Sequence, residues 1–131
     1  MNSRYLISID DDPLNNLINK ILIEKFFPEI RLECFTESVD GLAHIISLIP
    51  NGEIKVIILL DVVMPPFSCW DLLEKLSAYS TQIKKNFRIF LLSATIDPGV
   101  INKANFNELI AGYIEKPLSK SKIEHILSVE F

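Results

Sequence analysis

Short apolar runs alternate along this chain with segments of helical periodicity, and this alternation constrains the possible fold strongly. The runs interpreted as strands are Tyr5–Ile9, Ile30–Phe35, Val56–Leu60, Phe87–Leu92 and Ala111–Ile114. Between them and after the last, apolar residues recur at the three- and four-residue spacing of a helix. Strands that alternate with helices through short connections predict a parallel sheet with helices on both faces.

Five helical segments are predicted, and residues at their starts support three of them. Asp12 is expected to cap the first helix, and Ser38 and Ser119 to cap the second and the last. The segments are bounded by their apolar positions as Leu14–Phe27, Leu42–Ile49, Trp70–Tyr79, Val100–Leu109 and Ile123–Val129. About 130 residues in this alternation fit a flavodoxin-like α/β fold, a doubly wound five-stranded parallel sheet of order 2-1-3-4-5.

Four of the strand-like runs lead into residues that can hold a phosphoryl group or a metal ion. These residues are Asp10, Asp11 and Asp12 after the first run, Asp61 after the third, Ser93 after the fourth, and Glu115 and Lys116 after the fifth. The carboxyl ends of parallel strands face one crevice, so we expect these residues to meet there. Adjacent carboxylates repel one another, which makes a bound cation the better explanation of the acidic cluster.

Length and charge restrict the classes of function. The 131 residues are expected to form one domain, residues 1–131. A formal net charge of -4 argues against nucleic acid as a partner, because binding its backbone needs a clustered basic surface.

The sequence also predicts a location. No apolar run is long enough to span a bilayer, and the first one is too short for a signal peptide, so no membrane partner is expected. The cysteines, Cys34 and Cys69, have no metal-binding spacing and are too few for a disulfide framework. We therefore expect a reducing, cytoplasmic location.

Four motifs, in this order and each at an expected strand end, resemble the receiver domain of two-component response regulators. They are Asp10-Asp11-Asp12-Pro13, Asp61-Val62-Val63-Met64-Pro65, Ser93-Ala94 and Lys116-Pro117. Each motif alone is common, whereas the ordered combination is specific and covers essentially the whole chain. The resemblance implies a CheY-like domain of the stand-alone, single-domain type.

The resemblance implies a phosphorelay function. Asp61 would be the phosphoacceptor, supplied by the phosphohistidine of a sensor histidine kinase or a histidine phosphotransfer protein. Mg²⁺ is the implied cofactor, with Asp11 as a direct ligand and Asp10 acting through water. Asp61 and the main-chain carbonyl of Val63 would complete the protein ligands. Oxygen ligands of this kind suit Mg²⁺.

The same resemblance implies a switch. Lys116 and Ser93 would hold the phosphoryl group, and Ser93 would move towards it. Tyr113 matches an aromatic residue that turns inward on activation; the alternative is an edge-strand tyrosine that packs on the surface. The helix after Ser93, the strand that contains Tyr113 and the last helix would then bind a downstream protein of unknown identity. Such a protein is not an enzyme beyond its own phosphorylation and dephosphorylation.

The segment Ser68-Cys69-Trp70 departs from the family pattern, which usually has a glycine before the bulky residue. Glycine is favoured where φ is positive or where backbones approach closely. Cys69 therefore implies either an altered loop or a conventional φ. We expect an inert small hydrophobe at this position, with a reactive thiol near the site as the alternative.

Two other functions remain open from the sequence. The chain could be a receiver-like interaction module that never takes phosphate. It could also be a phosphatase similar to the haloacid dehalogenases, because Asp10 and Asp12 after a strand resemble the nucleophile motif of that family. The aspartate that becomes phosphorylated distinguishes these functions.

Overall fold

The computed structural model describes residues 4–62, 68–94 and 97–131, and its strands form one parallel sheet of order β2-β1-β3-β4-β5. The strands are β1 (Tyr5–Ile9), β2 (Arg31–Phe35), β3 (Val56–Asp61), β4 (Phe87–Ser93) and β5 (Ile110–Glu115). This order confirms the predicted doubly wound fold, with β3 at the centre and β2 at one edge.

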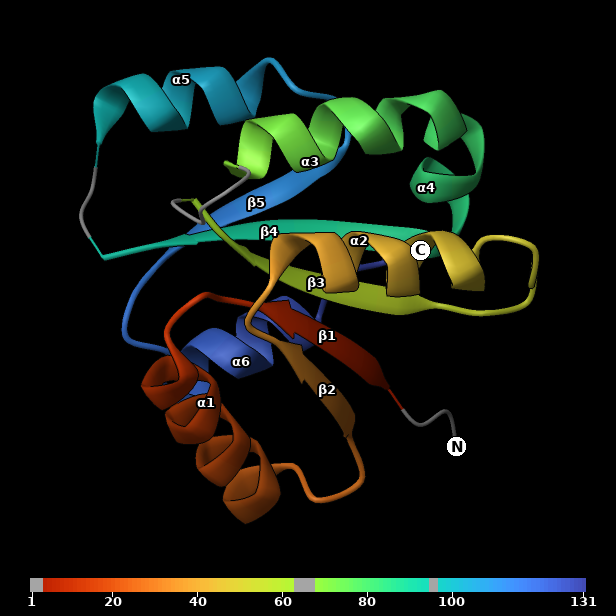
Figure 1. The fold of residues 1–131 in the computed structure, drawn as a ribbon. Coiled ribbons are helices and arrows are strands. Elements are labelled where there is room, and N and C mark those ends of the chain that lie inside the picture. The colour runs from red at the N-terminus through yellow and green to blue at the C-terminus, as the bar shows by residue number, and fades with distance from the viewer. Residues whose placement is uncertain (1–3, 63–67, 95–96) are drawn as a thin grey trace.

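Helices cover both faces of the sheet (Figure 1). They are α1 (Pro13–Phe26), α2 (Ser38–Leu48), α3 (Cys69–Leu76), the 3₁₀ helix η1 (Ser77–Tyr79), α4 (Ser80–Asn86), α5 (Pro98–Asn105) and α6 (Lys120–Leu127). The buried clusters divide accordingly, with α2, α3, α4 and α5 on one face and α1 and α6 on the other. None of the described helices is long and apolar enough to cross a membrane.

The alternation of side chains along buried strands explains the two cores. In β1, Ile7 and Ile9 belong to the cluster under α2, whereas Leu6 belongs to the cluster under α1 and α6. All six residues of β3 are buried, as expected for a central parallel strand with helices on both faces. Burial of each apolar side chain of this strand contributes about 1.5–3 kcal/mol.

Two of the three predicted helix caps are confirmed. Asp12 accepts a hydrogen bond from the Leu14 N–H at 2.9 Å, and Ser119 accepts one from the Lys122 N–H at 3.2 Å. The prediction for Ser38 was wrong. Glu37 is the extended residue before α2, so Ser38 lies inside the first turn, and its buried hydroxyl has no partner among the described residues.

The structure corrects the extent of two predicted helices. The segment between β3 and β4 is divided into α3, η1 and α4, and α3 begins with a reciprocal capping box between Ser68 and Asp71. The next helix, α5, begins earlier than expected because Asp97 caps it and Pro98 occupies its first turn. It ends at Asn105, so the residues up to Leu109 lead into β5 instead.

A polar cluster joins α2 to the edge of the sheet. The His44 Nε2 atom lies 2.6 Å from the Tyr5 hydroxyl and 2.9 Å from a Glu33 carboxylate oxygen. Glu33 also pairs with Arg31 at 2.6 Å, and the Phe35 ring lies 5.2 Å from the His44 ring. These contacts hold the helix over strand β2, which pairs with another strand on one side only.

Candidate functional site

Three carboxylates converge where β1 and β3 end. Asp10 and Asp11 follow β1, and Asp61 is the last residue of β3, the strand that pairs with β1. One carboxylate oxygen from each of the three residues lies within 4.8 Å of the others. Adjacent parallel strands thus bring together side chains that are fifty residues apart, at the kind of crevice where open α/β sheets bind ligands.

Asp10 is the most enclosed of the three carboxylates, at 1% exposed. One of its oxygens accepts a hydrogen bond from the Asp12 N–H at 3.0 Å, and the other accepts one from Lys116 at 2.7 Å. Its backbone is also fixed, because its N–H donates to the Phe35 carbonyl at 3.0 Å. Burying a carboxylate costs free energy unless it is paired in this way.

Lys116 lies between two of the carboxylates. Its Nζ atom is 2.7 Å from Asp10 and 3.3 Å from Asp61. Burial alone would favour the neutral amine, but the hydrogen bond to Asp10 and the charges of Asp61 and Asp10 outweigh it and raise the pKa of Lys116. The group is therefore an ammonium ion at neutral pH, placed where it can also neutralise an incoming anion.

The end of β4 is joined to this lysine through the backbone. The Lys116 N–H donates to the Ser93 carbonyl at 2.7 Å, and the peptide bond from Lys116 to Pro117 is cis. Ser93 lies at the end of β4, opposite Glu115 of β5. Tyr113 is half-buried and packs on the core beneath α2, α3 and α5. Its role in switching stays a prediction.

The donor set fits a divalent cation that prefers oxygen ligands. Asp10, Asp11 and Asp61 offer converging carboxylates, and Asp11 is exposed at the mouth of the crevice. Asp12 is not part of this cluster, because its carboxylate is engaged in capping α1. Val63, expected to supply a carbonyl ligand, lies outside the described residues.

Comparison with known proteins bears on the fold. No family model and no curated protein match the sequence. A two-component response regulator from Cytophaga hutchinsonii superposes with a TM-score of 0.83 at 24% identity, over 97% of this chain and 96% of that one. A response regulator receiver protein from Dyadobacter fermentans gives 0.84 at 22% identity, over 95% of each chain.

The fold is that of a response-regulator receiver domain. A complex of CheX, CheY, BeF₃ and Mg²⁺ from Borrelia burgdorferi also matches, with a TM-score of 0.70 at 19% identity. That match covers 95% of this chain and 86% of the other. The receiver fold was expected from the sequence motifs, and the carboxylates and the lysine meet at the strand ends where that expectation put them.

Within this receiver fold, Cys69 adopts the conventional conformation. It is the first residue of α3, and no described residue has a positive φ. Its side chain is fully buried in the core, where burial and then the nearby charge of Asp61 raise the pKa of the thiol to about 12. A protonated, enclosed thiol is a poor nucleophile, so the structure favours the inert hydrophobe over the reactive cysteine.

Two asparagines on the inner side of α1 were not identified from the sequence. Asn16 and Asn19 are 6% and 5% exposed, and they share the inner side of the helix with Ile23. Asn16 contacts the backbone of the acidic site, whereas Asn19 lines a neighbouring pocket. Their spacing from Ile23 was the available signal, because residues three, four and seven apart share one side of a helix.

Proposed function

We propose that this chain is a cytoplasmic response regulator that is controlled by phosphorylation of Asp61. The phosphoryl donor is the phosphohistidine of a sensor histidine kinase or of a histidine phosphotransfer protein. The observation that carries the proposal is the ammonium group of Lys116 within 3.3 Å of Asp61, beside three converging carboxylates. The receiver fold of the matching response regulators supports it.

The proposed transfer follows from the groups around Asp61. A carboxylate oxygen of Asp61 attacks the phosphorus atom, and the phosphorus–nitrogen bond of the phosphohistidine breaks. The bonding electrons return to the imidazole nitrogen, which becomes neutral imidazole after proton uptake. Lys116 offsets the charge of the phosphoryl oxygens, and Ser93 donates a hydrogen bond to one of them.

The acidic cluster is proposed to bind Mg²⁺. When bound, the ion offsets the repulsion between the Asp61 carboxylate and the phosphoryl group. Asp11 is the direct ligand because it is exposed and free to exchange water for metal, whereas both oxygens of buried Asp10 already accept hydrogen bonds. Asp10 therefore acts through water, and Val63 would add its carbonyl. The Mg²⁺ and BeF₃ in the CheY complex from Borrelia burgdorferi support this proposal.

The phosphodonor is proposed to dock on α1. The helix exposes four large apolar side chains at positions i, i+3, i+4 and i+7, which we call the α1 apolar stripe: Leu14, Leu17, Ile18 and Ile21. Each is about half exposed, whereas asparagines occupy the inner side of the same helix. A stripe at this spacing suits packing against a helix of another protein. It starts next to the acidic residues, so a helix laid along it would bring its histidine near Asp61.

The output of the switch is proposed to be the face formed by α5, β5 and α6. Tyr113 lies in β5 and packs on the core beneath α5, and the backbone of Ser93 is bonded to Lys116 at the end of the same strand. Movement of Ser93 towards a phosphoryl group would therefore displace the end of β5. The downstream partner would bind one of the two resulting states more tightly.

Phosphorylation by a small donor tests the proposal. Incubation with acetyl phosphate and Mg²⁺ should increase the intact mass by one phosphoryl group, and Asp61→Asn should abolish the increase. Asp71→Asn is the matched control, because Asp71 belongs to the capping box of α3. An unchanged mass in the wild-type protein would favour an interaction module that never takes phosphate.

A further inference from the structure

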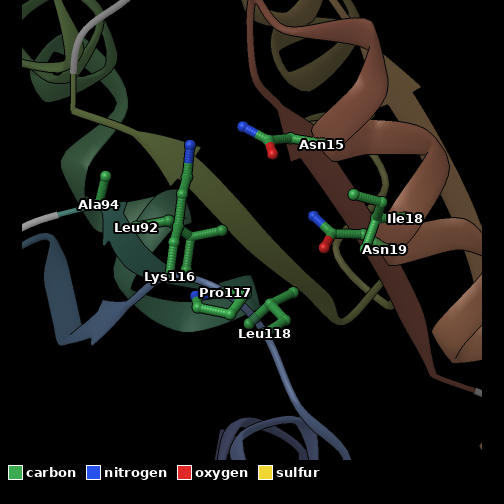
Figure 2. Close-up of a pocket in the computed structure, with 8 residues that line it drawn as sticks. All are labelled: Asn15, Ile18, Asn19, Leu92, Ala94, Lys116, Pro117 and Leu118. Carbon is green, nitrogen blue, oxygen red and sulfur yellow. The ribbon is translucent and has the colours of Figure 1, made fainter.

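A pocket of about 290 Å³ lies beside the acidic site, between α1 and the segment that joins β5 to α6 (Figure 2). Its lining consists of Asn15, Ile18 and Asn19 from α1, Leu92 from β4, Ala94 just after β4, and Lys116, Pro117 and Leu118 from the facing segment. The walls are mainly apolar, and the polar groups are two carboxamides and one ammonium. Ligand pockets commonly have this composition.

Asn19 is the unusual residue of this pocket. It is 5% exposed, and its side chain has no hydrogen-bond partner within residues 4–62, 68–94 and 97–131. Figure 2 shows its amide projecting from α1 towards the wall formed by Pro117 and Leu118. Neither polar atom of this amide is fully enclosed, because the Ser38 hydroxyl is the one buried side-chain polar atom without a partner among the described residues. The Asn19 amide therefore opens into the pocket, where its donor and its acceptor can bond to water or to a ligand.

Asn16, three residues earlier on the same side of α1, provides the contrast. Its carboxamide accepts a hydrogen bond from Ser8 and donates to the carbonyls of Asp10 and Phe35. Asn16 is thus fully used in holding the fold, whereas Asn19 offers a donor and an acceptor to the pocket. This difference indicates that the Asn19 amide is available to a ligand.

The chemistry of the walls defines that ligand. A carboxamide pairs with a group that presents a donor beside an acceptor, and the apolar walls favour a flat ring. The ammonium of Lys116 is directed at Asp10 and Asp61. Its positive charge therefore serves the acidic site, and the part of the pocket beside Asn19 carries no charged side chain. We propose that this pocket binds a small neutral planar ligand, an aromatic or heteroaromatic ring with a carboxamide or lactam group that pairs with Asn19.

Such a ligand would lie against Lys116 and Pro117, the residues that follow β5. Its binding would therefore be coupled to the position of the lysine that contacts Asp10 and Asp61. The binding itself does not require Asp61 to accept a phosphoryl group. Ligand binding in this pocket can therefore be measured whether or not Asp61 is phosphorylated.

Benzamide is the probe for the test, followed by ¹H–¹⁵N NMR titration of the full chain. We expect saturable shifts of the Asn19 side-chain NH₂ signal and of the Leu118 backbone amide. Methyl benzoate, which has no N–H donor, should bind more weakly. Asn19→Leu should weaken benzamide binding by about tenfold or more, the size expected for one lost pair of hydrogen bonds.

Two further variants make the result decisive. Asn102→Leu places the same replacement at an exposed position of α5 and should leave benzamide binding unchanged. Asn19→Asp keeps the shape of the side chain but removes the N–H donors, so it should also bind benzamide more weakly. It replaces Asn19→Leu in the test if that variant does not fold. The proposal is overturned if benzamide gives no saturable shift, which means the pocket holds water alone, or if folded Asn19 variants bind it as tightly as the wild type.

Discussion

The side-chain amide of Asn16 donates a hydrogen bond to the main-chain carbonyl of Asp10, 3.1 Å away. The same nitrogen lies 3.4 Å from the Phe35 carbonyl, and the amide oxygen accepts a hydrogen bond from the Ser8 hydroxyl at 3.1 Å. One uncharged, buried side chain therefore joins the ends of β1 and β2 to α1. The position of the acidic residues depends on it.

Replacement of Asn16 by leucine should destabilise the fold and weaken Mg²⁺ binding together. The carbonyl of Asp10 and the hydroxyl of Ser8 lose their partner, which costs about 1–3 kcal/mol in the free energy of unfolding. The shifted backbone should reduce Mg²⁺ affinity by roughly 10–100-fold, as for other residues that orient metal ligands. Urea unfolding and calorimetric titration with Mg²⁺ measure the two effects.

Asn102→Leu, on the exposed side of α5, is the control and should change neither quantity. An Asn16→Leu protein that is less stable but binds Mg²⁺ like the wild type would show that Asn16 supports the fold without orienting the site.

Replacement of Lys116 by methionine should destabilise the protein in the absence of Mg²⁺. It leaves buried Asp10 without its cationic partner, and breaking a buried pair costs about 3–5 kcal/mol. Added Mg²⁺ should recover part of this loss, because it supplies the missing positive charge. Thermal unfolding with EDTA and with Mg²⁺ measures both effects, and Lys20→Met on the exposed side of α1 is the control. A loss that Mg²⁺ does not reduce would argue against a metal at the acidic cluster.

Cys69 should make the protein less stable at alkaline pH. The folded-state pKa of its thiol is about 12, whereas an unfolded thiol has a pKa of about 8.5. The folded protein therefore binds more protons above pH 8.5 or so, and its stability falls as the pH rises, by up to about 2 kcal/mol by pH 10. Cys69→Ala should lower stability at every pH but flatten this decline. An equal slope in both proteins would contradict the raised pKa.

The α1 apolar stripe should be needed for transfer from a protein donor but not from a small one. Leu17→Asp places a charge in the stripe and should slow phosphotransfer from a phosphohistidine protein by about tenfold or more, as for a central interface residue. Acetyl phosphate should still phosphorylate this variant at the wild-type rate. Phe106→Asp is the control, because Phe106 is 92% exposed at the end of α5 and far from the stripe in sequence. Equal slowing by both variants would place the donor elsewhere.

The sheet could be predicted from the sequence because its signals are local and redundant. Each strand is a short apolar run, and the helical segments between them require parallel crossovers, which leaves few topologies. Helix boundaries were less predictable, because they depend on tertiary contacts. Serine is a residue type that commonly caps helices, but the residue before the first turn of α2 is Glu37, one position before Ser38.

The inner side of α1 shows where periodicity fails. The spacing of the α1 apolar stripe predicted the helix correctly. An apolar stripe on a helix normally packs against the core. The structure turns it outward and buries Asn16, Asn19 and Ile23 instead. Periodicity reports that a helix has an apolar side, but not whether that side meets the core or another protein.

The site was predictable in its carboxylates and lysine, because strand ends in a parallel sheet meet by topology. The asparagine contacts were not, because a polar residue in a helix is normally exposed and only the packed structure shows it to be buried. The roles of Ser93, Tyr113 and Val63 stay predictions.

The most direct test of the account is to identify the residue that carries the phosphoryl group. After reaction with acetyl phosphate and Mg²⁺, borohydride reduction converts an aspartyl phosphate to homoserine, which peptide mapping by mass spectrometry can locate. The account predicts a single modified residue, Asp61. Modification of Asp10 instead would point to the phosphatase alternative, and the absence of any modified aspartate would contradict the account.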